Sequence, residues 1–478
     1  MKYNSFDSIQ SEISSGNLTA TKLVSDYLTA IEDTKSLNIY VEVFEEEAKQ
    51  RAKALDEKYS KDPNSVGRLY GMVISIKDVI CYKDHQVTGG SKILAGFESL
   101  YTATALQRLL DEDVIVIGRV NCDEFAMGSA NENSAYGPTI NGIGKNRVPG
   151  GSSGASAVSV QVNSCLASLG SDTGGSVRQP AAFCGLVGMK PTYGRISRYG
   201  LLAYASSFDQ IGTITHNVTD AALLLEIMAG PDEYDSTASQ EVVERYSELS
   251  TDSAPKKIAY FKSAFDHPSM DPEIRTKSME FLEKLKKNGH NVASVTFDLL
   301  DYLIPAYYVL TTAEASTNLS RYDGVRFGYR SPEVSNLEET YKKSRTEGFG
   351  SEVKRRILLG TFVLSSGYYD AYDGKAQKVR RLIKEQTKEI FKSFDLILMP
   401  ISPTVAWKIG EKSDDPIATY LADIYTVQAN MTGVPAIAIP LGVNSENMPF
   451  GIQFIADRNK ESSLFKFTKG LDNQTLTN

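Results

Sequence analysis

Two glycine- and serine-rich loops constrain the fold of this chain more than any other feature. The first covers residues 149–156, PGGSSGAS, and the second covers residues 170–180, GSDTGGSVRQP. Their composition alone is typical of a flexible linker. The first loop, however, runs directly into apolar stretches at 157–162 and 165–169, which have to be buried. Glycine-rich loops at the ends of buried elements indicate backbone that approaches a ligand closely.

Helix and strand patterns alternate on both sides of these loops. Apolar residues at helical spacing predict helices within residues 9–31, with Thr19 or Thr21 as N-cap, and over 43–59 and 274–288, with another helix ending at 106–110. Short apolar, β-branched runs predict strands at 69–76, 114–118, 257–261, 396–399 and 434–439. The alternation favours the α/β class, with helices on both faces of a sheet. Residues 230–255 are polar and are predicted to form a surface excursion.

Charge and cysteine usage exclude several classes of protein. The net charge is −8 over 478 residues, which argues against a broad nucleic-acid-binding surface on this chain. It does not exclude a partner protein that holds the nucleic acid. The cysteines at 81, 122, 165 and 184 form no C-x-x-C motif, so we expect reduced, buried thiols and no metal site. The N-terminus lacks an apolar signal-peptide core, and no run of about 18 apolar residues exists. We therefore expect a cytoplasmic protein without a membrane span.

Three familiar kinds of site fit the sequence poorly. Neither loop contains the G-x-x-x-x-G-K-[ST] or G-x-G-x-x-G pattern of a phosphate-binding loop. The segment around Ser152 matches G-x-S-x-G by spelling, but a polar segment ending in proline precedes it where a nucleophile elbow needs a buried strand. The chain also has only four histidines, of which His267 and His290 lie in polar surroundings. Ser351 and Lys354 match S-x-x-K, yet their charged segment predicts a solvated helix turn.

A relay of two serines and a lysine fits better. A lysine acts as a base only when it is neutral, and burial lowers its pKa toward that state. Lys77 ends the apolar run 72–76, so it is placed for burial, although a salt bridge with Asp78 would be the ordinary alternative. Beside the two loops, Lys77, Ser152 and Ser176 form a candidate catalytic set.

These residues closely resemble the amidase signature. Residues 150–157 and 170–181, the spacing between Ser152 and Ser176, and Lys77 in the segment SIKD all match that family's pattern. Within the family, segments 123–129, 188–195, 313–319 and 347–357 resemble the A subunits of glutamyl-tRNA(Gln) amidotransferases. The similarity extends from about residue 5 to residue 470.

The resemblance implies one α/β domain, residues 1–478, built on a large mixed sheet covered by helices. It would comprise N-terminal helices in 1–62, the signature core in 63–230, and the remaining sheet, a helical excursion and substrate-binding elements in 231–478. It also implies a glutaminase that supplies ammonia to a partner subunit, which activates misacylated Glu-tRNA(Gln) with ATP and Mg²⁺, while a small third subunit joins the two. No cofactor is expected on this chain itself.

The resemblance assigns roles to individual residues. Ser176 would be the nucleophile and Ser152 would pass its proton to neutral Lys77. The N–H groups from Thr173, Gly174, Gly175 and Ser176 would form the oxyanion hole. For glutamine, Arg356 would bind the α-carboxylate and Asp423 the α-amine, with Ser129 and Tyr307 lining the pocket.

Two departures from the family pattern and two rival functions accompany this assignment. Ala155 replaces a usual glycine and is harmless only if its φ is negative; Thr213 and His216 stand where the family has a proline and an arginine. The rivals are a stand-alone amidase for another small amide and a non-catalytic scaffold that keeps the motifs by descent.

Overall fold

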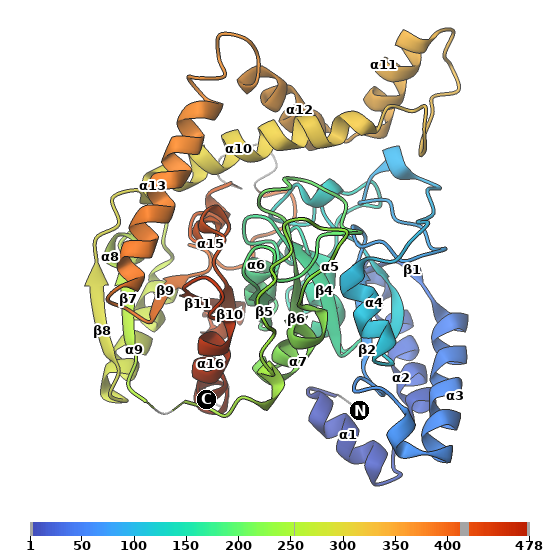
Figure 1. The fold of residues 1–478 in the computed structure, drawn as a ribbon, viewed down its shortest axis with the longest axis vertical. Coiled ribbons are helices and arrows are strands. Elements are labelled where there is room, and N and C mark those ends of the chain that lie inside the picture. Colours follow the sequence, from blue (N-terminus) through green and yellow to red (C-terminus); the bar gives the residue numbers. More distant parts are fainter. Residues whose placement is uncertain (1–2, 253, 412–419, 476–478) are drawn as a thin grey trace.

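A single mixed sheet of 11 strands organises the part of the chain that the computed structural model describes, residues 3–252, 254–411 and 420–475. The strand order is β1-β3-β2-β4-β6-β5-β10-β11-β9-β7-β8 (Figure 1). The strands are β1 (Tyr40–Val43), β2 (Val73–Lys77), β3 (Ile115–Val120), β4 (Ala167–Asp172), β5 (Val187–Lys190), β6 (Gln210–Thr215), β7 (Lys257–Phe261), β8 (Asn291–Val295), β9 (Leu396–Pro400), β10 (Ala436–Val443) and β11 (Pro449–Ala456).

Two groups of parallel strands flank an antiparallel centre. Strand β2 pairs parallel to β3 and β4, and β7 pairs parallel to β8 and β9. Strands β4, β6, β5, β10, β11 and β9 pair antiparallel in turn. The sheet is therefore mixed, as the sequence predicted.

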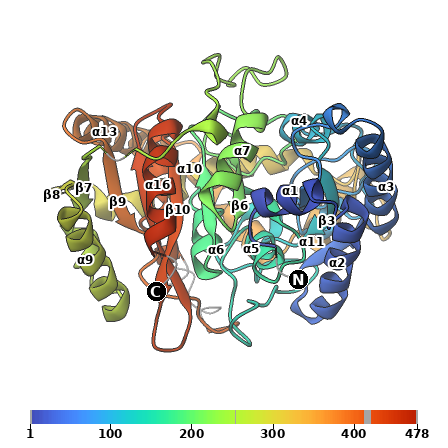
Figure 2. The same ribbon diagram turned by 90° about the horizontal axis from the view of Figure 1, so that it is seen from below.

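Helices cover both faces of the sheet. Figure 2 shows α5 and α6 on one face and α7 and α16 on the other. The helices up to α9 are α1 (Phe6–Ser14), α2 (Ala20–Asp33), α3 (Glu45–Lys61), α4 (Thr104–Asp111), α5 (Gly154–Gln161), α6 (Arg178–Phe183), α7 (Val218–Met228), α8 (Lys262–Phe265) and α9 (Pro272–Lys287). The later ones are α10 (Leu303–Asn318), α11 (Leu337–Gly348), α12 (Ser351–Val363), α13 (Asp373–Phe391), α15 (Val427–Thr432) and α16 (Glu461–Thr475).

The N-terminal helices form largely as predicted. The Thr19 side chain accepts a hydrogen bond from the Lys22 N–H and caps α2. The helix predicted from residue 43, however, begins at Glu45. Residues 40–43 instead form β1, because they pair antiparallel with β3 at the edge of the sheet.

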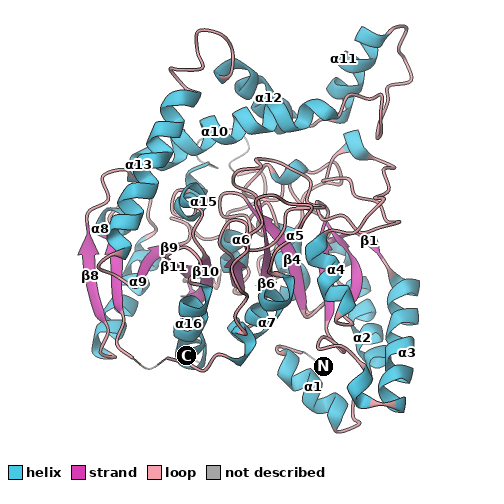
Figure 3. Ribbon diagram, viewed as in Figure 1, coloured by secondary structure: helices cyan, strands magenta, loops and turns pink. Residues whose placement is uncertain are grey.

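Helices α10 and α12 extend across one end of the strands, and α13 runs from that end down along them (Figure 3). They belong to the predicted segment 231–478, of which residues 253, 412–419 and 476–478 lie outside the described part; residues 1–2 of the first segment lie outside it too. Strands from all three predicted segments join the same sheet. Within the described ranges, no helix is long and apolar enough to cross a membrane.

Candidate active site

The parallel register of β2 and β4 brings the lysine and the second loop to one edge of the sheet. Ser75 and Ile76 of β2 pair with Ser168 and Leu169 of β4. Because parallel strands end at the same edge, Lys77 at the end of β2 lies beside residues 170–172 at the end of β4. Helix α5 begins at Gly154, within the last residues of the first loop, and packs on the same strands.

Lys77 is fully buried and surrounded by hydroxyl groups. Its Nζ lies 2.7 Å from Ser152 Oγ, 3.0 Å from Ser153 Oγ and 2.9 Å from Ser171 Oγ. Burial lowers the pKa of Lys77 to about 8, against the opposing effect of Asp123 and Asp172. A neutral amine has two N–H donors and one lone pair, so it can accept the Ser152 proton while donating to the other two hydroxyls.

The alternative salt bridge between Lys77 and Asp78 does not form. Asp78 is buried and pairs instead with the guanidinium of Arg119. Its carboxylate also accepts hydrogen bonds from the N–H groups of Thr88 and Gly90. The hydrogen-bond partners of the Lys77 Nζ are therefore serine hydroxyls and not Asp78.

Ser152 and Ser176 lie on two loops that the backbone ties together. The Ser153 N–H donates to the Ser176 carbonyl oxygen at 3.1 Å. Among the described residues, no hydrogen bond joins the two hydroxyls directly. Ser152 is completely buried, whereas Ser176 is 8% exposed. Of these two serines, Ser176 is thus the one that an incoming molecule can reach.

The second loop is packed so tightly that side chains are excluded from it. A Cβ on Gly174 would lie 2.5 Å from the Tyr307 hydroxyl oxygen, and a Cβ on Gly175 would lie 2.2 Å from Thr426 Oγ1. Gly175 also has φ of +131°, which disfavours any other residue. The backbone therefore faces these neighbours directly.

Asp172 fixes the conformation of this loop. It accepts hydrogen bonds from the Gly175 N–H at 2.9 Å and from Arg178 at 3.0 Å. Burial opposes its ionisation, but the Arg178 guanidinium outweighs burial and lowers the pKa of Asp172 to about 2. Because the Gly175 N–H donates to Asp172, it is not available in this conformation for the oxyanion hole that the sequence predicts from Thr173 to Ser176.

Asp423, predicted to bind the α-amine, lies beside Ser129, predicted to line the pocket. Ser129 Oγ donates to Asp423 Oδ2 at 2.5 Å, while Asp423 Oδ1 is buried without a hydrogen-bond partner among the described residues. Burial raises the pKa of Asp423 to about 7. Thr426 Oγ1 donates to the carbonyl oxygens of Asp423 and Gly174, which connects this group to the second loop.

Arg356, the residue predicted to bind the α-carboxylate, is buried. Its Nε donates to Glu352 Oε1 and its Nη1 to the Tyr204 hydroxyl, each at 2.8 Å. The guanidinium carbon lies 5.2–5.6 Å from the ring centres of Tyr204, Tyr308 and Tyr420. Its positive charge reaches Asp423, where it partly offsets the rise in pKa.

Several residues of this site escaped the sequence analysis. Ser153 and Ser171 stand next to predicted residues in the two loops, so their position in the motifs was the available signal. Tyr204 carries no sequence signal, because it meets Arg356 from 152 positions away.

The departure at residue 155 is accommodated locally, whereas Thr213 buries a hydroxyl oxygen that has no hydrogen-bond partner among the described residues. Ala155 lies in the first turn of α5, outside the positive-φ residues, and its N–H donates to Asn131 Oδ1. Alanine is therefore unstrained there. Thr213 lies within β6, where it pairs with Leu169 and Met189.

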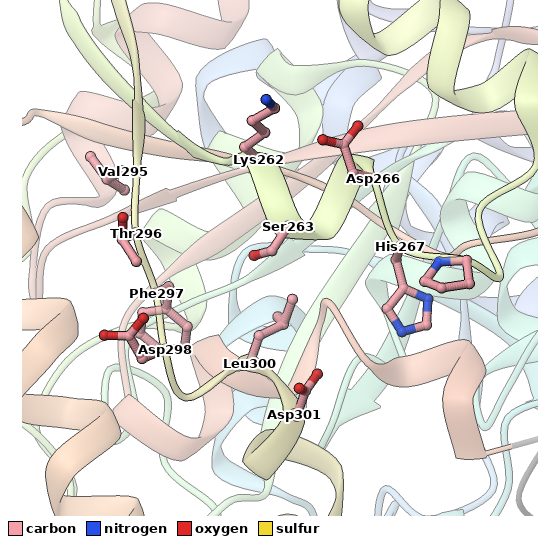
Figure 4. A pocket seen from close by; sticks show the side chains of 11 residues that line it. Lys262, Ser263, Asp266, His267, Val295, Thr296, Phe297, Asp298, Leu300 and Asp301 are labelled. Atoms are coloured by element: carbon pink, nitrogen blue, oxygen red, sulfur yellow. The ribbon is translucent and has the colours of Figure 1, made fainter.

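A separate cavity of about 490 Å³ opens at the ends of β7 and β8 (Figure 4). Lys262, Asp266, Asp298 and Asp301 line it, and all four of these side chains are exposed. None of the predicted catalytic or binding residues belongs to this cavity.

Comparison with known proteins agrees with this geometry. The family model described as Amidase matches residues 22–465. The chain is 49% identical over 466 residues to the A subunit of the Chlorobium phaeobacteroides glutamyl-tRNA(Gln) amidotransferase, and the match covers 97% of this chain and 98% of that protein. The corresponding A subunit from Chlorobium limicola is 48% identical over 475 residues, or 98% of this chain and 99% of that one.

Solved structures give the same result. The crystal structure of the A subunit from the Thermotoga maritima glutamyl-tRNA(Gln) amidotransferase superposes with a TM-score of 0.78 at 37% identity, covering 96% of this chain and 92% of that one. A crystal structure of an amidase superposes with a TM-score of 0.83 at 26% identity, covering 99% and 100%. The chain belongs to the amidase family, in the branch of the glutamyl-tRNA(Gln) amidotransferase A subunits.

Proposed function

We propose that this chain is the glutaminase subunit of a tRNA-dependent amidotransferase. The observation that carries the proposal is the contact of 2.7 Å between Lys77 Nζ and Ser152 Oγ inside a fully buried hydroxyl cluster. With a pKa of about 8, roughly a tenth of Lys77 is neutral at pH 7. A buried, partly neutral lysine beside two serines can serve as the base for acyl transfer.

The proton relay runs from Ser176 through Ser152 to Lys77. Ser176 Oγ attacks the side-chain amide carbon of glutamine while its proton passes to Ser152, whose own proton passes to Nζ of Lys77. The carbonyl oxygen becomes an oxyanion that the N–H groups of the second loop stabilise. The relay requires the two serine hydroxyls to approach each other when substrate binds, since they are not hydrogen-bonded in the resting structure.

Collapse of the tetrahedral intermediate breaks the C–N bond. The leaving nitrogen takes a proton back through Ser152 and departs as ammonia, leaving a γ-glutamyl ester on Ser176. Water then attacks the ester carbon, gives a proton to the same relay and releases glutamate.

Opposite charges at the two ends of the site favour a zwitterionic substrate. Arg356 offers a guanidinium for the α-carboxylate, and Asp423 offers a buried oxygen without a partner for the α-amine. Glutamine carries both groups, whereas a simple amide would leave Arg356 and Asp423 unused. This arrangement favours glutamine over the stand-alone amidase alternative.

The relatives of this chain also suggest that it works with partner subunits. The relatives are named as subunits of a glutamyl-tRNA(Gln) amidotransferase. We accordingly propose that two further subunits accompany this chain in the cytoplasm. One would bind misacylated Glu-tRNA(Gln) and activate its γ-carboxylate with ATP and Mg²⁺, and a small one would join the other two.

Glutamate release in the assembled complex tests the proposal. Ser176→Ala should abolish glutamine hydrolysis, while Ser351→Ala, at an exposed hydroxyl, should keep it. Full activity in Ser176→Ala would refute the mechanism and leave the scaffold alternative. Unchanged glutamine turnover in Arg356→Ala and Asp423→Ala would instead identify a simple amidase.

A further inference from the structure

Exposed apolar side chains gather where α12 leads into α13. Six residues form this surface, which we call the α12–α13 patch: Leu358, Leu359, Phe362, Tyr368, Tyr369 and Tyr372. Their exposed fractions range from 42% to 71%. The Phe362 ring centre lies 4.4 Å from that of Tyr368 and 5.7 Å from that of Tyr372, so the patch is continuous. A cluster of this kind on a protein surface marks an interaction site.

An apolar groove continues the patch. It encloses about 250 Å³ between α10 and α13, and Tyr302, Pro305, Val309, Tyr372 and Val379 line it. Tyr372 belongs to both the groove and the patch. Aromatic rings beside an apolar groove fit the apolar face of a partner helix.

The charges around the groove select one occupant. Lys375 lines the groove, and Lys378 follows one turn later on α13; both are exposed, and neither has an ion-pair partner among the described residues. A partner with carboxylates beside its apolar face would therefore be complementary. A second copy docked in a two-fold contact would instead bring the same lysines of both copies to one interface.

The patch lies on the opposite side of α12 from the substrate site. Val353, Arg356 and Gly360 share the buried face of this helix, whereas Leu358, Leu359 and Phe362 share the exposed face. Whatever binds the exposed face therefore restrains the helix that holds Arg356.

We infer that the α12–α13 patch and its groove bind an amphipathic helix of an amidotransferase partner subunit, with carboxylates beside the apolar face of that helix. This contact fixes the position of Arg356 for glutamine binding. This inference rests on the proposed function. It predicts that the complex binds glutamine more tightly than the chain alone, because binding of the partner on one face of α12 removes motion on the other.

The test uses the chain together with the two partner subunits that the proposed function assigns to it, taken from the same host. The dissociation constant for the partner pair is measured by titration, and KM for glutamine is measured with and without the pair. Leu358→Ser with Tyr368→Ser removes patch side chains. Leu100→Ser with Tyr234→Ser removes the same residue types, at 79% and 66% exposure, outside the patch. Lys375→Glu with Lys378→Glu reverses the charge.

We expect the patch and charge variants to weaken partner binding by about tenfold or more and to raise KM in the mixture, with melting temperatures equal to that of the control. Equal binding by patch and control variants would overturn this inference while leaving the proposed function intact. Wild-type chain that hydrolyses glutamine yet ignores the partner pair would overturn both. Dimers of the free chain that dissociate in the patch variant would assign the surface to a second copy and overturn the inference.

Discussion

The carboxylate of Glu124 holds the N-terminus of the helix that carries Arg356. Its Oε1 and Oε2 atoms lie 3.1 and 2.9 Å from the backbone nitrogen of Gly350, the N-cap residue of α12. The Ser91 hydroxyl also donates to Oε1. A negative charge at this end of a helix is favourable, because unpaired N–H groups point toward it. Glu124 thus connects the turn before Ser129 to the helix of Arg356.

We expect Glu124→Gln to raise KM for glutamine several-fold and to leave kcat within about twofold. At about pH 8.5, above the raised pKa of about 7 of Glu124, the amide keeps an acceptor for Gly350 but loses the charge, so Arg356 is held less firmly while the serine relay is untouched. Steady-state kinetics of glutamate release measure both constants. Glu98→Gln, at an exposed position, is the control. A fall in kcat without a change in KM would contradict the assigned role.

The same group gives a pH dependence with a defined sign. Burial raises the pKa of Glu124 to about 7, although Ser91 and Gly350 lower it, as does Lys354. Lys92, Glu132, Glu347 and Glu352 line the adjoining cavity. The folded carboxyl keeps its proton up to about pH 7, while the unfolded one releases it near its ordinary 4.5, so this group makes stability fall as pH rises between those values. The melting temperature of the wild-type protein should fall as pH rises across that window, and Glu124→Gln should make this fall smaller. Identical slopes of melting temperature against pH in the two proteins would refute the assignment to Glu124.

Ser171 should tune the base. Its hydroxyl oxygen lies 2.9 Å from Lys77 Nζ and stabilises the ammonium form more than the amine, because hydrogen bonds from charged donors are stronger. Wild-type kcat/KM should rise with pH through about 8, as Lys77 loses its proton. Ser171→Ala should move that rise to lower pH. The control is Ser269→Ala, at an exposed hydroxyl. A rise that stays in place would show that Ser171 does not act on Lys77.

Gly175 should not tolerate a side chain. Alanine there adds left-handed strain and a contact of 2.2 Å with Thr426 Oγ1, so the loop that carries Ser176 has to shift. We expect Gly175→Ala to lower kcat by about 10²-fold or more, because the backbone N–H groups of the shifted loop no longer point toward the oxyanion. Gly16→Ala is the matched control, since Gly16 also has positive φ but nothing lies within 4 Å of its Cβ. A comparable fall of kcat in both variants would mean that a general loss of stability, and not a shift of the loop that carries Ser176, causes it.

The parts of the site that could be predicted from the sequence are those that lie close together along the chain. Lys77, Ser152 and Ser176 stand in short motifs next to apolar runs, and the register of β2 and β4 brings them to one edge. The contact between Glu124 and Gly350 joins residues 226 positions apart, and no local pattern records it. Arg356 could be assigned only by the resemblance, because its burial depends on Tyr308 of α10 and on Tyr204 and Tyr420, which lie far from it along the chain.

Strands β5 and β6 were missed for a reason of packing. Each contains a glycine at a point of close approach: a Cβ on Gly188 would lie 2.7 Å from the Ala181 Cβ, and one on Gly212 would lie 2.4 Å from the Met189 carbonyl oxygen. Glycine weakens the β-branched pattern by which a strand is recognised. The tight packing that requires these glycines therefore also hides the strands in the sequence.

His85 joins the N-terminal helices to the catalytic core through a pair that depends on pH. Its Nε2 lies 2.7 Å from Glu47 Oε2 and its Nδ1 lies 2.8 Å from the Lys83 carbonyl oxygen, so both neighbours are acceptors and the imidazolium form satisfies both. Burial lowers the pKa of His85, but the hydrogen bonds to Glu47 and to the Lys83 carbonyl oxygen, together with the charges of Glu47 and Glu42, outweigh burial and raise it overall. The stabilisation is therefore complete below the ordinary pKa of 6.5 and is lost as pH rises through the higher folded value. Denaturant unfolding at about pH 6 and about pH 8.5 should show a larger loss for His85→Gln at the lower pH. An equal loss for His85→Gln at both values would mean that packing of the ring against Tyr82, at a centroid distance of 4.1 Å, and not its charge, stabilises this junction.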